Sequence, residues 1–126
     1  MTKLTQQFFK ALSVCVGDEP IKARLSQAWT KHLDSIDCDN MPRSIRADFR
    51  ELRTAMYQET PRSGEHPAHA SVRKMSAKQA AYHSRTIASI FGLLSMLDQY
   101  QADCESGDIV VHIAESYSKE TDRTLN

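Results

Sequence analysis

Apolar residues recur at helical spacing in several stretches of the chain, and each stretch is bounded by residues that start or end helices. The first runs from Leu4 to Val16 and stops before Gly17, a residue type that commonly follows the last turn of a helix. The second begins at Pro20, after two acidic residues, and ends near Cys38. These stretches predict two amphipathic helices joined by a short turn.

A third helix is predicted from Pro42 to about Gln58, because its apolar positions step by four, three and four residues. These positions are Ile45, Phe49, Leu52 and Met56. Residues 59–70 contain two prolines, one glycine and almost nothing apolar, which is typical of an exposed loop. We expect this segment to be the longest connection in the chain.

Ser76 and Gln79 have the spacing of a capping box and predict the start of a fourth helix. From Ala80 to Leu97 the apolar positions alternate three and four residues apart, which makes this helix the best-defined element. Further apolar residues widen the stripe, so we expect other helices to cover its second half on most sides. These residues are Phe91, Leu93, Met96 and Tyr100. The expected core includes Leu12, Trp29, Phe49, Ile87, Ile90, Phe91 and Leu94.

The β-branched run 109–114 follows Asp108, which could cap a short fifth helix; a strand formed across a dimer is the alternative. The pattern therefore predicts an all-α fold, a helical bundle of four main helices with a short fifth C-terminal element. We expect residues 1–117 to form one domain and residues 118–126 to form a polar, frayed tail.

The composition changes this picture little. A chain of 126 residues with 40% apolar and 25% charged residues can bury one core, and it lacks the composition of a disordered protein. Three widely spaced cysteines favour free thiols in a reducing compartment. We find neither a signal peptide nor a stretch long enough to span a bilayer, and we expect a cytoplasmic protein with no membrane association.

Sixteen basic and sixteen acidic residues cancel, so any recognition of anions must be local. Two basic groups are candidates for binding an anion or an acidic partner. The first is a stripe along the third helix, formed by Arg43, Arg46, Arg50 and Arg53. The second surrounds the start of the fourth helix and comprises Arg73, Lys74 and Lys78. If antiparallel packing brings the two groups to a common groove, they form a site; otherwise they are solvated flanks with local ion pairs.

Catalytic and metal-binding signals are weak. His66 and His69, with Glu65, offer chemically competent ligands, but spacing on a loop does not enforce geometry, so we expect exposed histidines and no metal. His83 lies on the apolar stripe of the fourth helix, where a core or boundary histidine is the usual outcome. No phosphate-binding glycine loop, nucleophile elbow or dinucleotide turn is present, and no cofactor is expected.

These observations favour a small non-enzymatic protein-binding module, such as an adaptor, a chaperone-like protein or a regulatory protein, that binds a protein partner or a second copy of itself. The alternative is a protein that binds nucleic acid or a phosphate ligand through the local arginines and lysines, with a steep dependence on salt. An enzyme or metal protein built around residues 65–69 or His83 is the second rival.

Overall fold

The computed structural model describes residues 1–106, and all regular structure within them is helical, which confirms the all-α prediction. The chain divides into two compact units, Met1–Leu94 and Ser95–Asn126, and the boundary falls inside the longest helix. The helical segments of the described residues are α1 (Lys3–Cys15), α2 (Ile21–Ala28), η1 (Trp29–Leu33), η2 (Cys38–Asn40), α3 (Arg43–Met56), α4 (Pro67–Lys74) and α5 (Ala77–Ser106).

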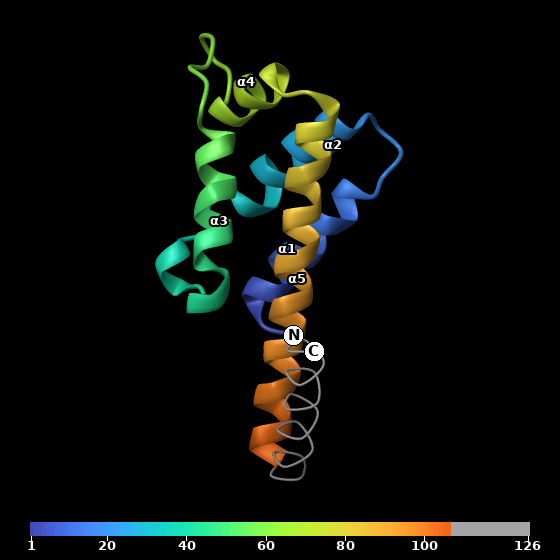
Figure 1. The fold of residues 1–126 in the computed structure, drawn as a ribbon, viewed down its shortest axis with the longest axis vertical. Helices are drawn as coiled ribbons and strands as arrows, with labels where there is room; N and C mark the ends of the chain where they lie inside the picture. Colours follow the sequence, from blue (N-terminus) through green and yellow to red (C-terminus); the bar gives the residue numbers. More distant parts are fainter. Residues whose placement is uncertain (107–126) are drawn as a thin grey trace, which may run out of the picture. The chain divides into compact units, whose positions relative to one another are not determined.

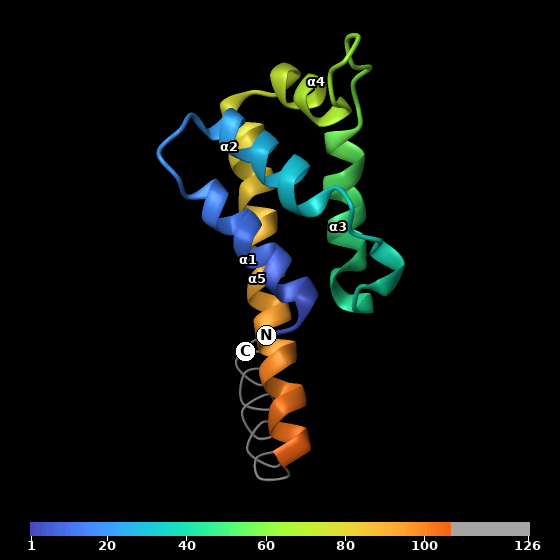
Figure 2. The ribbon, with the colours of Figure 1, turned by 180° about the vertical axis from the view of Figure 1, so that it is seen from behind.

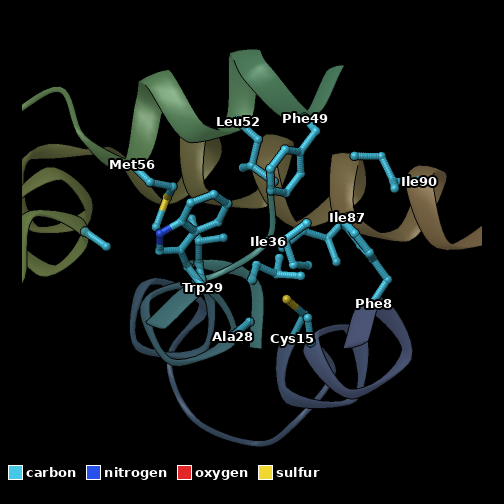
Figure 3. Packing of buried hydrophobic residues seen from close by; sticks show 14 of the residues in the cluster. Phe8, Cys15, Ala28, Trp29, Ile36, Phe49, Leu52, Met56, Ile87 and Ile90 are labelled. Carbon is cyan, nitrogen blue, oxygen red and sulfur yellow. The ribbon is translucent and has the colours of Figure 1, made fainter. Parts of the chain in front are cut away.

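Within the first unit, α1 and α2 pack on one side of the first half of α5. They lie behind α5 in Figure 1 and in front of it in Figure 2. The helix α3 stands beside them, and α4 connects the end of α3 to the start of α5 (Figures 1 and 2). This arrangement leaves a central space that side chains from α1, η1, α3 and α5 fill together (Figure 3).

The core is organised around an aromatic group. The Trp29 and Phe49 rings stack with centroids 5.7 Å apart, and Phe8 meets Phe49 edge-on at 5.9 Å. All three side chains are fully buried. Of the expected core residues, Trp29, Phe49, Ile87, Ile90 and Leu94 are buried, whereas Leu12 and Phe91 are only partly buried at its edge. The apolar periodicity therefore identified the centre of the core correctly.

The predicted capping box at the start of α5 is confirmed. The Gln79 backbone N–H donates to Ser76 Oγ at 3.0 Å, and the Ser76 N–H donates to Gln79 Oε1 at 2.9 Å. This reciprocal pair is the predicted capping box, and it satisfies two of the donors that a helix start leaves unpaired.

The predicted second helix is divided in the structure. Its α-helical part ends at Ala28, and the chain continues as the wider π-helical turn η1, in which the Asp34 N–H donates to the Trp29 carbonyl at 2.9 Å. A π turn inserts an extra residue into the helical repeat and is often associated with a functional or packing requirement. Here it places Trp29 in the core and Asp34 at its border.

The expected loop 59–70 is shorter than predicted, because α4 begins at Pro67. His66 caps this helix, and proline suits its first position because a missing N–H is not needed there. The buried face of α4 is made of small residues, which do not produce a recognisable apolar stripe. These residues are Ala68, Ala70, Ser71 and Val72.

The expectation that other helices cover the second half of α5 on most sides is wrong. Leu93, Met96 and Tyr100 are exposed, with 40%, 65% and 46% of their surface accessible, and Phe91 is only partly buried. The 30 residues of α5 span about 45 Å, whereas the 14 residues of α3 span about 21 Å.

Some sequence predictions cannot be compared with this structure. The short fifth element with its strand alternative, and the tail 118–126, lie outside the described residues. Within residues 1–106, no helix is both long and apolar enough to cross a membrane.

Candidate functional site

Two of the four arginines of α3 bind backbone carbonyls of the preceding segment. Arg46 donates to the Met41 carbonyl at 3.1 Å, and Arg53 donates to the carbonyls of Asp34 and Ile36 at 3.2 and 2.5 Å. The Arg53 guanidinium also lies over the two stacked core rings, 5.2 and 5.3 Å from their centroids. Both side chains therefore hold the irregular segment 34–41 against α3.

The remaining basic candidates are more exposed. Arg50 lies 3.7 Å from Asp39 in a solvent-exposed ion pair, and Arg73 pairs with Glu65. Three exposed side chains have no polar partner among the described residues. They are Arg43, Lys74 and Lys78.

The arginine stripe runs along α3 from its first residue, Arg43, to Arg53 in its last turn. The start of α3 and the turn between α4 and α5 lie far apart along the vertical direction in both views (Figures 1 and 2). Four of the seven basic residues, Arg46, Arg50, Arg53 and Arg73, already have partners within the chain. Binding of an anion or an acidic partner at these residues stays a prediction.

A polar network that no sequence motif predicted surrounds Asp34. Its Oδ1 accepts hydrogen bonds from Trp29 Nε1, at 3.0 Å, and from the Tyr57 hydroxyl, while His66 Nε2 lies 3.1 Å from Oδ2. Burial acts to raise the pKa of Asp34, but the hydrogen bonds from Tyr57, His66 and Trp29 together lower it. The same bond to Asp34, with a smaller contribution from burial, raises the pKa of Tyr57.

His66 uses both of its ring nitrogens in this network. Nδ1 accepts a hydrogen bond from the Ala68 N–H at 2.9 Å, so in the neutral ring the proton is on Nε2, which faces Asp34. An imidazole in this arrangement has no free lone pair for a metal ion or for proton abstraction. The network joins η1, the end of α3 and the start of α4, and its role in the described structure is to hold these segments together.

The other ligands proposed around residues 65–69 are also engaged. His69 Nδ1 forms a hydrogen bond with Ser26 Oγ, and the Glu65 carboxylate accepts from the Arg62 N–H at 3.1 Å besides pairing with Arg73. The described residues contain one group of three metal-ligating side chains whose ligand atoms lie within 4.8 Å of one another. It is formed by Asp37, Cys38 and Asp39, and not by the histidines.

The cysteines and His83 do not form a reactive group in the described residues. Burial raises the pKa of the Cys15 thiol, and the smaller opposing effect of a hydrogen bond with Ser84 does not cancel this rise. Little of the nucleophilic thiolate therefore forms. Burial also lowers the pKa of His83, which lies at the border of the core as its place on the apolar stripe predicted. Cys38 is half-buried and Cys104 is exposed.

A contiguous exposed apolar surface lies in the second unit, on the last three turns of α5. Met96, Leu97 and Tyr100 have 65%, 40% and 46% of their surface accessible, and Cys104 is exposed as well. At about 100° per residue, these four side chains fall within one sector of about 100°. We refer to Met96, Leu97, Tyr100 and Cys104 as the α5 stripe.

The apolar pattern of the sequence includes Met96, Leu97 and Tyr100, which other helices were expected to cover. Ile87, Ile90 and Leu94 are buried, and Leu97 and Cys104 continue the same alternation of three and four residues along α5. The apolar stripe of α5 is therefore buried as far as Leu94 and exposed at Leu97 and beyond.

Comparison of the chain with known protein families, curated proteins and solved structures finds no match.

Proposed function

We propose that this chain is a non-enzymatic protein-binding module and that the α5 stripe is its binding surface. The observation that carries the proposal is the exposure of three large apolar side chains, Met96, Leu97 and Tyr100, on one face of one helix. Scattered apolar residues are normal on protein surfaces, whereas contiguous ones mark interaction sites. Tyrosine is enriched among the residues that dominate binding energy, and methionine adapts its shape to a partner.

The internal bonding of the polar groups supports a non-enzymatic role. Asp34, Tyr57 and His66, a cluster of three ionisable side chains in the first unit, donate to and accept from one another and the backbone. Nucleic-acid or phosphate binding through the basic residues stays the alternative, and Arg43, Lys74 and Lys78 are the groups exposed for it. Binding of that kind weakens steeply as salt rises, which separates it from apolar docking.

Site-specific photo-crosslinking in the native host tests the proposal. Benzoylphenylalanine replaces Tyr100 in one strain and Tyr82 in another. Tyr82 is the matched control because it is a tyrosine of the same helix, 52% exposed, eighteen residues before Tyr100. We expect irradiation to give a discrete adduct with another polypeptide from position 100 and none from position 82.

The adduct must also depend on the neighbouring side chain. Met96→Ser, introduced beside the crosslinker, should lower the adduct yield at least fivefold while the far-UV circular dichroism and the melting temperature of the purified chain stay unchanged. Equal adducts from positions 82 and 100, or none from either, would show that the α5 stripe is not the binding surface.

A further inference from the structure

The first turn of α4 is capped by a side chain that can take up a proton. His66 occupies the N-cap position, and its Nδ1 accepts a hydrogen bond from the Ala68 N–H at 2.9 Å. Most helices are capped by serine, threonine, asparagine or aspartate, whose oxygens accept hydrogen bonds in neutral and in mildly acidic solution. An imidazole nitrogen accepts a hydrogen bond only while it carries no proton. The cap of α4 therefore exists only while the His66 ring is neutral.

Protonation does not detach the other side of the same ring. His66 Nε2 lies 3.1 Å from Asp34 Oδ2 and donates to it in both the neutral and the charged ring. The charged ring attracts this carboxylate more strongly, because a hydrogen bond between two ions is stronger than one between an ion and a neutral group. In the charged ring Nδ1 also carries a hydrogen, so it would face the Ala68 N–H donor to donor. Protonation thus strengthens the bond to Asp34 and removes the bond to α4.

The groups that face the ring from η1 and α3 keep their charge in mild acid. Burial acts to raise the pKa of Asp34, but its hydrogen bonds lower it, so Asp34 stays a carboxylate. Tyr57, whose ring centroid lies 5.9 Å from that of His66, stays neutral because the bond to Asp34 raises its pKa. Arg53 donates to the Asp34 carbonyl and is cationic throughout. None of these groups changes state over the range in which an imidazole titrates.

The groups on the side of α4 also stay bound. The His69 ring meets the His66 ring edge-on, with centroids 6.2 Å apart, and His69 Nδ1 forms a hydrogen bond with Ser26 Oγ of α2. A hydroxyl donates to a neutral imidazole and accepts from a charged one, so this bond holds in both states. The Glu65 carboxylate is paired with Arg73. In mild acid α4 therefore keeps its contact with α2 while its first turn loses its cap.

We infer that His66 is a pH-sensitive cap, which in mild acid takes up a proton, stays bound to Asp34 and releases the first turn of α4. The ring is 30% exposed, so protons reach it from solvent. An unperturbed histidine titrates at about pH 6.5, and histidine is the side chain that serves most pH-dependent switches near neutrality. The inference concerns the first unit and does not rest on the proposed binding surface.

Nuclear magnetic resonance of the full ¹⁵N-labelled chain between about pH 7.5 and pH 5 tests this inference. Two-bond proton–nitrogen spectra report which nitrogen of the His66 ring carries a proton, and hydrogen exchange gives the protection factor of the Ala68 amide. We expect the Nε2–H tautomer at pH 7.5. As the ring takes up its second proton, the Ala68 protection factor should fall at least fivefold with the same midpoint. The protection factor of Phe49, in the middle of α3, should stay unchanged.

Two variants separate the cap from the neighbouring histidine. His66→Asn places an uncharged cap of a preferred type at the same position, so its Ala68 protection factor should not change between pH 7.5 and pH 5. His69→Gln leaves His66 in place and should keep the response of the parent. A response that persists in His66→Asn, or disappears in His69→Gln, would overturn the inference.

The parent chain alone can also contradict it. A His66 ring that does not titrate in this range, or that titrates while the Ala68 amide keeps its protection, would show that the cap is not a switch. So would an Nδ1–H tautomer at pH 7.5. Loss of protection at Phe49 together with Ala68 would show that acid unfolds the whole unit instead of the first turn of α4.

Discussion

Replacing Asp34 by asparagine should destabilise the first unit, because the carboxylate accepts hydrogen bonds from three different segments. Trp29 Nε1, the Tyr57 hydroxyl and His66 Nε2 all point at its two oxygens. Asparagine keeps the shape but has one acceptor oxygen, and its amide NH₂ group would face the N–H of His66. His66 cannot relieve this conflict by moving its proton to Nδ1 without losing the bond from Ala68.

The expected cost follows from this geometry. A hydrogen bond to a charged group contributes about 1.5 to 3 kcal/mol, and the substitution removes the charge from three such bonds and leaves one donor opposite another. The Asp34 and His66 side chains are 29% and 30% exposed, so solvent screens part of the interaction. We therefore expect Asp34→Asn to lower the free energy of unfolding by about 1 to 3 kcal/mol at pH 7.

The pH dependence gives a second, independent prediction. The folded state lowers the pKa of Asp34, so the carboxylate stabilises the fold above the unfolded-state pKa of about 3.9. This stabilisation is lost as pH falls through the lower folded-state value. The stability difference between the parent and Asp34→Asn should therefore be fully present at pH 7 and shrink below about pH 4.

Urea denaturation followed by tryptophan fluorescence at several pH values measures both quantities. Asp18→Asn is the control, since this exposed aspartate has no polar partner among the described residues and should unfold like the parent. If Asp34→Asn matches the parent at pH 7, or differs from it equally at pH 7 and pH 3, the network around Asp34 does not hold the segments together.

Three further predictions concern the core, the start of α5 and the thiols. Phe49→Ala should cost about 3 to 5 kcal/mol in urea denaturation, because the fully buried ring packs against two other aromatic rings; a loss below 1 kcal/mol would contradict the described packing. Ser76→Ala should cost about 0.5 to 2 kcal/mol by removing the capping oxygen, and an unchanged thermal melt would show that the capping box contributes nothing. Cys104 should react with a thiol reagent at least tenfold faster than Cys15 at pH 8, because Cys15 is buried and its pKa is raised; equal rates would refute this assignment of burial.

The parts of the fold that the sequence predicted are those with strong local signals. Helical periodicity and the Ser76–Gln79 spacing identified α5 and its start, and the stripes of α1 and α3 identified buried residues such as Phe49. α4 was missed because alanine and serine bury little apolar surface, so their burial leaves no visible period. The small buried side chains of α4 leave no apolar period in the sequence, and they also allow the helix to pack closely.

The candidate sites show a different limit of sequence reasoning. Asp34, Tyr57 and His66 are separated by 23 and 9 residues, and only the tertiary fold brings them together. The apolar pattern at Met96, Leu97 and Tyr100 was visible, but other helices were expected to cover it, since apolar periodicity shows that a face needs covering and does not show what covers it. The continuation of the apolar pattern past Leu94 to Leu97 and Tyr100 was the feature of the sequence that bears on an external partner.

The most direct test of the central claim, that the α5 stripe binds a protein partner, is the affinity of the purified crosslinked partner for the parent chain and for Leu97→Ser, measured by isothermal titration calorimetry. Truncating a hot-spot side chain at the centre of an interface costs about 2 kcal/mol or more, and 1.4 kcal/mol is a factor of about ten in Kd. We predict at least tenfold weaker binding for Leu97→Ser at an unchanged melting temperature. Equal affinities of the two chains would contradict the account.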